Sequence, residues 1–321
     1  MADVLNHDSL KNRSPKSGSP KRGSVKIGVV GVVGGWSSES LADRVAERTG
    51  FRLLVDMEHV SARLDEGRVP FGDFDLCELD GLIIKKVGAE YNAHLLDRLE
   101  LLRYVEQCGV AIFSKPLSIL RLLDRLSCTV TLAGGGIPLP ATEVTLDVRQ
   151  AVSAVRRFGK AVAKGLYSTK ARGMLVVSGD DPELAAKLSE FQAADNPVLY
   201  IQQMLKLPGR DLGVAFLGGQ YLGAYARVKA DEAWNTTIHS GGHYEPYEPS
   251  PQILELARRA QALFDLDFTG VDVVETERGP MVFEVSAFGG FSGLRDGCQV
   301  DAAARYADYV LECCRARKES A

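Results

Sequence analysis

Short apolar runs alternate with amphipathic segments in the first third of the chain. Buried parallel strands are predicted from continuous apolar runs at residues 25–31, 51–55, 81–84 and 110–113. Amphipathic helices are predicted from a helical period at residues 38–48 and 93–108. This order predicts a small α/β domain with a mostly parallel sheet over residues 25–119.

Beyond residue 119 the apolar segments are shorter and are separated by polar, glycine-rich loops. Helices are predicted at residues 117–132, 148–158, 181–191, 249–264 and 298–316. Strands are predicted at residues 161–164, 174–178, 198–205, 212–217 and 221–228.

An acidic hairpin is predicted near the C-terminus. Two apolar strands, residues 271–276 and 281–287, are joined by a short polar connection that ends in glycine and proline, which is typical of a hairpin. Side chains alternate between the two faces of a strand. Glu284 and Ser286 should therefore share one face with Val282.

Any register that pairs the apolar faces of these strands also brings Asp272 to the face of Glu284. Two carboxylates on one inner face repel each other and are costly to desolvate unless a cation lies between them. Hard oxygen ligands suit Mg2+, which keeps several waters and usually bridges to substrate phosphates. An ordinary amphipathic hairpin with a solvated acidic face remains the open alternative.

A loop of small and cationic residues follows the strand predicted at residues 161–164. That strand ends in Lys164, and the loop contains Ser168, Thr169 and Lys170. Backbone N–H groups of small residues and the heads of lysines can approach phosphate oxygens closely. The loop fits a polyphosphate cradle, and an exposed hairpin tip is the open alternative.

The first predicted strand runs into a glycine-rich turn formed by Gly28, Gly31, Gly34 and Gly35. In a dinucleotide site, Asp56 at the end of the next strand would bind the ribose. The spacing is GxxGxxGG and not GxGxxG, because Val30 stands where the second glycine is required. A turn beside a substrate pocket is favoured over an NAD site.

The composition is that of an ordinary soluble protein. Apolar residues make up 45% and charged residues 25% of the chain, with a formal net charge of −4, so no general attraction to nucleic acid or membrane is expected. No apolar run reaches 18 residues. Residues 1–24 are basic and rich in serine and proline, which predicts a disordered tail without a secretory signal. The sequence does not distinguish a monomer from a homo-oligomer.

Six cysteines are present, with no CxxC pair and no matching histidine cluster. This spacing argues against a zinc site and against a disulfide framework, and it fits a reducing cytoplasm. The adjacent pair Cys313 and Cys314 is a candidate for redox activity, but idle thiols near a helix end are favoured.

Taken in order, four segments resemble the ATP-grasp superfamily, and most closely its RimK-like branch of carboxylate–amine ligases. They are the Asp124-Arg125-Leu126 segment, the strand ending in Lys164 with its loop, residues 202–205 with 209–211, and the hairpin GVDVVETERGPMVFEVSAFGGFSG. The resemblance extends from about residue 26 to residue 309. The segments LDRLSCT and STKARGM are further similar to a bacterial subgroup, the GAK-system ATP-grasp enzymes.

The resemblance implies an ATP-grasp fold, in which two α+β lobes clamp ATP. The small lobe would cover residues 120–200, and the large lobe with the metal site residues 201–321. A pre-ATP-grasp α/β domain would precede them over residues 25–119. The implied cofactors are ATP and two Mg2+ ions, with Mn2+ as a substitute.

The resemblance also implies roles for individual residues. The phosphates would be contacted by Arg125, Lys164, Ser168, Thr169, Lys170, Asn235, Thr236 and Thr237. The adenine would be contacted by Gln203 and Met204, and the ribose hydroxyls by Asp211. The Mg2+ ligands would be Asp272, Glu284 and Ser286. Arg227 would neutralise charge during catalysis.

The implied reaction joins a carboxylate to an amine. The carboxylate attacks the γ-phosphate to give an acyl phosphate, and the amine then displaces phosphate to form an amide. By analogy, an amino acid such as glutamate would be added to a protein tail or to a small molecule. A nucleotide-binding regulator that has kept the clamp and lost turnover is the alternative from a different class.

The chain departs from the family pattern at several positions. Arg125 stands where the family usually has lysine, Gln203 replaces an acidic hinge residue, and Ser286 replaces asparagine, which is a better metal ligand. Gly213 and Asn235 stand where close relatives carry arginine. Either turnover is reduced, or the phosphates are handled by other cations, namely Lys170, Arg172, Lys229 or Arg227.

Overall fold

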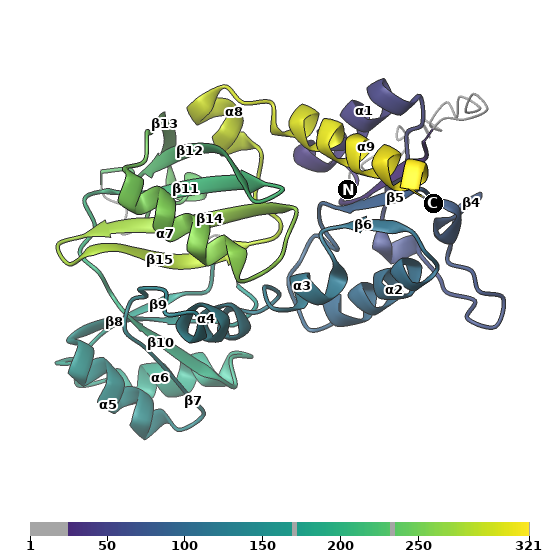
Figure 1. Ribbon diagram of the computed structural model, residues 1–321. Coiled ribbons are helices and arrows are strands. Elements are labelled where there is room, and N and C mark those ends of the chain that lie inside the picture. Colours follow the sequence, from purple (N-terminus) through teal and green to yellow (C-terminus); the bar gives the residue numbers. More distant parts are fainter. Residues whose placement is uncertain (1–24, 169–171, 232–234, 321) are drawn as a thin grey trace, which may run out of the picture.

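The computed structural model describes residues 25–168, 172–231 and 235–320, which form three larger sheets, a small hairpin and the surrounding helices (Figure 1). The predictions made for residues 1–24, Thr169 and Lys170 lie outside this part of the chain. Among the described residues, no helix is both long and apolar enough to cross a membrane.

The first sheet is entirely parallel, with the strand order β2-β1-β5-β6. Its strands are β1 (Ile27–Val30), β2 (Leu54–Val55), β5 (Gly81–Ile84) and β6 (Ala111–Phe113). The connections contain α1 (Trp36–Thr49), η1 (Met57–His59), β3 (Pro70–Phe71), β4 (Phe74–Asp75), η2 (Leu76–Glu78) and α2 (Leu95–Gln107). Every residue of β1 and β5 is buried, because helices cover both faces of the sheet. The predicted parallel sheet is confirmed.

The C-terminal helix α9 (Ala302–Ser320) returns to this first sheet and packs against α1 (Figure 1). Tyr306 and Val310 of α9 share a buried cluster with Leu41 of α1 and Ile27 of β1. The helical period of residues 298–316 predicted a helix there, but a period alone does not identify the surface on which a helix packs.

The glycine-rich turn after β1 is explained by close packing and backbone conformation. A Cβ atom on Gly31 would lie 2.6 Å from Cβ of Ser38, so only glycine allows α1 to approach the strand this closely. Gly34 has a φ of 74°, in the left-handed region. The Val32 N–H donates to Ser38 Oγ at 3.2 Å, which fixes the turn.

The second sheet is antiparallel, with the strand order β7-β10-β8-β9. Its strands are β7 (Thr142–Thr145), β8 (Lys160–Lys164), β9 (Leu175–Ser178) and β10 (Leu199–Gln203). Two helices, α5 (Val148–Phe158) and α6 (Leu184–Ala193), pack on one face and enclose a small core with Ala163 and Ile201. Lys164 therefore lies at the end of a strand whose preceding residues are buried.

The third sheet is also antiparallel, with the strand order β13-β12-β11-β14-β15. Its strands are β11 (Arg210–Leu217), β12 (Gln220–Val228), β13 (His243–Pro246), β14 (Phe268–Thr276) and β15 (Gly279–Ser286). Helix α7 (Pro251–Ala262) packs on β14 and β15, while α8 (Ser292–Cys298) packs on β12 and β13. A short 3-10 helix, η3 (Ile238–Ser240), precedes β13.

Residues 117–132 form two helices, not the single helix predicted from their period. They are α3 (Pro116–Leu120) and α4 (Arg125–Gly134). Asp124 caps the second helix, because its Oδ1 accepts a hydrogen bond from the Ser127 N–H at 2.8 Å. The cap starts a new helix axis and places Arg125 in its first turn.

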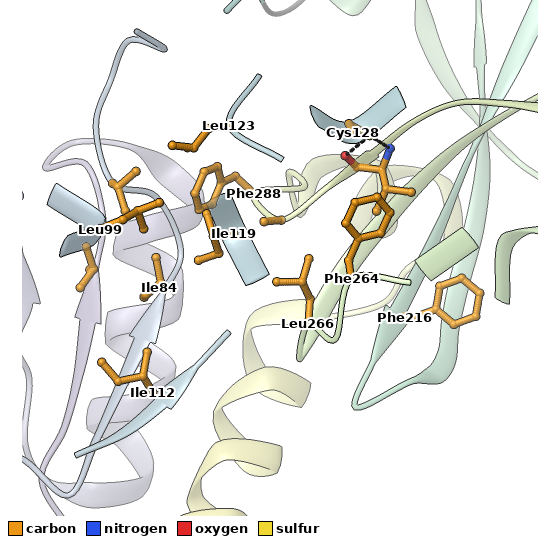
Figure 2. Packing of buried hydrophobic residues seen from close by; sticks show 14 of the residues in the cluster. Ile84, Leu99, Ile112, Ile119, Leu123, Cys128, Phe216, Phe264, Leu266 and Phe288 are labelled. Atoms are coloured by element: carbon orange, nitrogen blue, oxygen red, sulfur yellow. Dashed lines mark hydrogen bonds between the residues drawn. The ribbon is translucent and has the colours of Figure 1, made fainter. Parts of the chain in front are cut away.

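One apolar core joins the first domain to the third sheet. Figure 2 shows Ile84 and Leu99 of the first domain on one side of this core. Phe216 of β11 and Phe264, which follows α7, lie on the other side. Ile119 of α3 lies between these groups (Figure 2). The continuous core fixes the orientation of the hairpin β14–β15 relative to the first domain.

A β-bulge interrupts this hairpin next to its acidic residues. Asp272 pairs with Glu284, but the register shifts directly after Asp272 and leaves Phe283 as the extra residue. Val282 and Val285, three positions apart, are therefore both buried in the same core. The prediction that Val282 shares the face of Glu284 is wrong, because strict alternation assumes a strand without a bulge.

Tyr225 of β12 packs against glycines of neighbouring elements. A Cβ atom would lie 2.5 Å from Tyr225 Cζ if built on Gly213, and 2.2 Å from it if built on Gly293. On Gly297 it would lie 2.5 Å from Tyr225 Cβ. Gly213 is also the register partner of Tyr225. The tyrosine ring thus occupies the space above Gly213. By the family resemblance, close relatives carry arginine at this position.

We predict that Gly293→Ala lowers the free energy of unfolding by about 1–3 kcal/mol, because the added methyl group overlaps the ring of Tyr225. Urea unfolding of the purified chain measures this change. Gly290→Ala is the matched control, since a Cβ atom there meets nothing within 4 Å, and its effect should stay within about 0.5 kcal/mol. Equal effects of the two substitutions would contradict the packing account.

Candidate functional site

The acidic side chains of the hairpin lie opposite each other, as the sequence predicts. The register of β14 and β15 pairs Asp272 directly with Glu284. Ser286 follows on the same face, separated from Glu284 by the buried Val285, and pairs with Gly270. The structure therefore brings the three predicted metal ligands together on one face of the hairpin.

Each of these carboxylates contacts an arginine from another part of the chain. Arg227 of β12 places Nη2 3.0 Å from Asp272 Oδ2. Arg125 of α4 places Nη1 2.9 Å from Glu284 Oε2. The arginine side chains are 20% and 9% exposed, whereas Asp272 is 26% and Glu284 42% exposed, so the ion pairs are shielded mainly on the arginine side. The arginines supply positive charge that two neighbouring carboxylates require.

Arg227 also binds Asp211, its register partner on β11. Its Nε donates to Asp211 Oδ1 at 3.2 Å, and its Nη2 donates to Oδ2. Burial by itself lowers the pKa of Arg227, but Asp272 and Asp211 outweigh burial and hold the pKa well above its usual value. The guanidinium therefore stays charged between two carboxylates.

Asp272 is the carboxylate with the least favourable surroundings. Burial raises its pKa above the usual range of an aspartate, Arg227 offsets part of the rise, and Glu284 and Asp211 add to it. An additional cation at this position would relieve the repulsion among the three carboxylates. This is the electrostatic condition under which a metal ion binds.

Arg125 links the hairpin to the loop that follows β8. Its backbone N–H donates to Leu166 O at 2.9 Å, and its Nη2 donates to Ser168 O at 3.0 Å. The third side-chain donor, Nε, is buried and has no hydrogen-bond partner among the described residues. Arg125 therefore connects the loop at Ser168 with Glu284 of the hairpin.

Lys164, at the end of β8, directs its ammonium group toward the same cluster. Its Nζ donates to Gln202 Oε1 at 2.6 Å and lies 5.4 Å from the centre of the Phe283 ring. Burial, with a smaller contribution from Arg125 and an opposing one from Glu284, lowers the pKa of Lys164 to about 7. A nearby polyphosphate would restore the charged form, because opposite charges favour ionisation.

The predicted adenine residues lie where β10 ends. The backbone N–H of Gln203 donates to Ala141 O at 2.8 Å, and that of Met204 donates to Lys160 O at 2.9 Å. Both side chains are half-buried. Their backbone is thus fixed to two neighbouring segments while the side chains remain partly accessible.

The predicted phosphate-side segment forms a compact polar turn. Asn235 Oδ1 accepts hydrogen bonds from the N–H of Thr237 at 3.1 Å and from its hydroxyl at 2.8 Å. Thr236 between them is half-buried. The turn is stabilised by its own side chains, and its contact with a ligand stays a prediction.

A supporting network around Lys164 was not predicted from the sequence. Gln202 is 3% exposed and donates from Nε2 to Thr142 Oγ1 at 3.1 Å, which orients its oxygen toward the lysine. Tyr200, the register partner of Lys164, shares a hydrogen bond of 2.8 Å with Thr129 Oγ1. Tyr200 and Gln202 are two residues apart on one strand, so their side chains lie on the same face of the sheet. This spacing is the sequence signal that would have grouped them, and the pairing of Tyr200 with Lys164 puts that face at the lysine.

The first domain reaches the same hairpin through two residues that follow β5. Tyr91 packs edge-on against Phe288, with ring centres 5.9 Å apart. Lys85 is 1% exposed and donates from Nζ to Gly289 O at 2.5 Å. Burial lowers the pKa of Lys85 to about 7. Both contacts hold the loop directly after Ser286, and neither was predicted from the sequence.

The donor set fits Mg2+ together with a nucleotide. Within the described residues, no group of three or more His, Cys, Asp and Glu side chains could hold a metal ion. Asp272 and Glu284 would contribute carboxylates and Ser286 a hydroxyl, and the other oxygen ligands would come from phosphates and water, as is usual for Mg2+. Arg125 and Lys164 add cationic groups near Glu284, since Arg125 pairs with it and Glu284 acts on the pKa of Lys164.

Residues 123–310 match the family model described as the RimK-like ATP-grasp domain. This match covers more than half of the chain, so the chain belongs to the RimK-like ATP-grasp family. The chain is also similar to the tetrahydromethanopterin:alpha-L-glutamate ligase of Methanosarcina acetivorans. The two are 25% identical over an alignment of 309 positions that covers 86% of this chain and 94% of the relative.

Solved structures agree in fold. The ATP-grasp ligase PsnB, complexed with a phosphomimetic variant of its minimal precursor, Mg and ADP, has a TM-score of 0.70 at 19% identity, covering 91% of this chain and 99% of that chain. A RimK domain ATP-grasp protein from Sphaerobacter thermophilus has a TM-score of 0.68 at 22% identity, covering 89% and 99%.

These comparisons confirm the ATP-grasp fold predicted from the sequence. The family match and the ligase names of the relatives also confirm the predicted class, an ATP-dependent carbon–nitrogen ligase. The narrower resemblance to the GAK-system subgroup and the roles of individual residues stay predictions.

We predict that Lys164→Met raises the free energy of unfolding at pH 7 by about 1–3 kcal/mol in the absence of ligands, because a buried cation is replaced by an apolar chain. The folded pKa lies below the ordinary one, so the unfolded chain binds the proton more tightly. Wild-type stability should therefore rise with pH from about 7 toward roughly 10.4. The variant should lose part of this rise and keep the part due to Lys85.

Urea unfolding at several pH values provides the measurement. Lys160→Met is the matched control, because Lys160 lies on the same strand and is exposed. Its effect should stay within about 0.5 kcal/mol at every pH. An unchanged pH dependence in the Lys164 variant would show that the ammonium is not in a shielded environment.

Proposed function

We propose that this protein is an ATP- and Mg2+-dependent ligase that joins a carboxylate to an amine through an acyl phosphate. The observation that carries the proposal is the register pair of Asp272 and Glu284, each in contact with an arginine. The ammonium group of Lys164 belongs to the same cluster, since Glu284 and Arg125 both act on its pKa. This arrangement of alternating charges suits a polyphosphate with its metal ions.

The proposed metal ligands are Asp272, Glu284 and Ser286, with two Mg2+ ions and Mn2+ as a substitute. The phosphates would be held by Arg125, Lys164, Ser168, Thr169, Lys170, Asn235, Thr236 and Thr237. Gln203 and Met204 would contact the adenine, and Asp211 the ribose. A bound Mg2+ ion would neutralise phosphate charge and shape the phosphates for transfer.

Arg227 is suited to stabilise charge during the reaction. It shares its donors between Asp211 and Asp272. If Asp272 were to hold an ion, Arg227 would stay anchored through its bonds to Asp211. The contact that it now makes with Asp272 would then be free for the negative charge that develops on the transferred group.

The proposed chemistry needs no covalent nucleophile from the protein. An oxygen of the substrate carboxylate attacks the γ-phosphorus, the bond from phosphorus to the bridging oxygen breaks, and ADP leaves. The amine nitrogen then attacks the carbonyl carbon, phosphate leaves, and the amine loses a proton. Lys164, Arg125 and Arg227 would lower both barriers by positioning groups and holding charge.

The proposed substrates follow from the relatives. Because a relative is named an alpha-L-glutamate ligase, an amino acid such as glutamate is the proposed amine. The proposed acceptor is a carboxylate on a protein tail or on a small molecule. PsnB, which is similar in fold, was solved with a precursor peptide variant, and this supports including peptide carboxylates among the candidates.

A nucleotide-binding regulator without turnover is the second candidate. Arg125 already pairs with Glu284 at 2.9 Å, and the Ser286 hydroxyl accepts the Phe288 N–H at 3.2 Å. Both interactions compete with metal ligation. A regulator of this kind would bind ATP and Mg2+ but release no product.

We predict that Asp272→Asn lowers kcat at least about 100-fold, because the amide loses the negative charge that binds Mg2+ at the reacting phosphate. ADP and phosphate release are measured with a panel of carboxylate acceptors and amino acids, glutamate included. The effect on ATP affinity should be smaller, since Lys164 and Arg125 remain.

The matched control is Glu275→Gln, three residues further along β14. Glu275 pairs with Arg210 at 2.9 Å and with Tyr247, away from the carboxylate cluster. This variant should retain wild-type turnover. Stabilisation of the wild-type protein by ATP and Mg2+ without ADP release for any member of the panel would instead favour the regulator.

A further inference from the structure

Two cysteines of the first domain, Cys77 and Cys108, lie side by side in the fold. The Sγ atoms of Cys77 and Cys108 are 2.9 Å apart, although the residues are 31 positions apart in the chain. A disulfide requires an S–S distance of about 2.05 Å. A movement of less than about 1 Å would therefore bring the two sulfurs to bonding distance.

Local hydrogen bonds hold the two residues in place. The Cys77 N–H donates to Asp75 Oδ1 at 3.1 Å, and the other oxygen of Asp75 accepts from Arg68 Nε at 2.9 Å. Cys108 directly follows α2, and its N–H donates to Tyr104 O at 3.1 Å. Both thiols are thus attached to ordered backbone, and their proximity does not depend on a loop closing.

The other cysteines lack such an arrangement. Cys128, Cys298 and Cys314 each donate from Sγ to a backbone carbonyl, those of Val285, Ala224 and Asp80 respectively. Cys313 and Cys314 are neighbours on α9, where successive side chains point about 100° apart. The adjacent pair named in the sequence analysis is therefore the less suitable pair for a disulfide.

We propose that Cys77 and Cys108 form a redox site, in which a two-electron oxidant such as hydrogen peroxide converts the two thiols into an intramolecular disulfide. The inference is independent of the proposed ligase reaction. It fits free thiols in a reducing environment, because the bond forms when an oxidant is present and is reversed by a dithiol.

The order of steps follows from exposure. Cys108 is exposed and Cys77 is half-buried, and burial raises the pKa of the Cys77 thiol, with Cys108 adding to the rise. The Cys108 thiolate attacks a peroxide oxygen, an S–O bond forms, the O–O bond breaks, and water is released after protonation. Sulfur of Cys77 then attacks sulfur of Cys108, the S–O bond breaks, and the leaving hydroxide takes the Cys77 proton to give a second water.

The disulfide would link the C-terminal end of α2 to η2, between β4 and β5. It would close a loop that contains β5 and all of α2. Cross-linking restricts the unfolded chain more than the folded one. The oxidised protein should therefore unfold at a higher temperature than the reduced protein.

The test treats the reduced full chain with a few equivalents of hydrogen peroxide, blocks remaining thiols with N-ethylmaleimide, and maps peptides by mass spectrometry without reduction. We expect a linked peptide pair containing Cys77 and Cys108, two hydrogens lighter than the sum of its parts. Dithiothreitol should restore both free peptides. The thermal midpoint should rise on oxidation and fall again on reduction.

Two variants make the test specific. In Cys77→Ser, the sulfenic acid of Cys108 should accumulate and react with dimedone, because its resolving partner is gone. Cys313→Ser should form the linked pair as the wild type does. The proposal is overturned if peroxide gives no Cys77–Cys108 peptide in the wild-type chain, or if linked peptides are spread evenly over all cysteines. The peptide map of the wild-type chain decides whether the disulfide forms, even if a variant folds poorly.

Discussion

Two carboxylates held opposite each other on one hairpin impose the constraint on which the site depends. Asp272 and Glu284 are register partners, so the backbone hydrogen bonds of β14 and β15 keep their side chains on one face. The ladder fixes the backbone positions from which the two side chains extend. Partial shielding from solvent strengthens the repulsion between the two carboxylates. It also strengthens their attraction to neighbouring cations, which are needed to offset the repulsion.

The fold supplies these cations from separate elements. Arg227 comes from β12, Arg125 from the capped start of α4, and Lys164 from the end of β8 in the second sheet. The first domain contributes Lys85, which holds the loop after Ser286. Under the proposed function, a bound Mg2+ ion would replace the arginines as the partner of these carboxylates, and the arginines would then be free to contact phosphate.

Much of this was predictable, because the physical signals are local. Apolar runs predicted the parallel sheet, and alternation placed Asp272 opposite Glu284. The β-bulge at Phe283 was not predictable, since no glycine or proline marks it and alternation alone misplaced Val282. The arginine partners, the return of α9 to α1 and the packing of Tyr225 on Gly213 depend on contacts between distant segments, which a periodic pattern does not encode. The family resemblance named Arg125 and Arg227 but not their partners.

A crystal structure with a non-hydrolysable ATP analogue and Mg2+ tests the central claim most directly. The account predicts Mg2+ at about 2.0–2.1 Å from oxygens of Asp272 and Glu284, with the Arg227 contact to Asp272 broken and its Nε contact to Asp211 kept. Nucleotide bound without an ion at these carboxylates, or with Arg227 and Arg125 still in their present ion pairs, would contradict it.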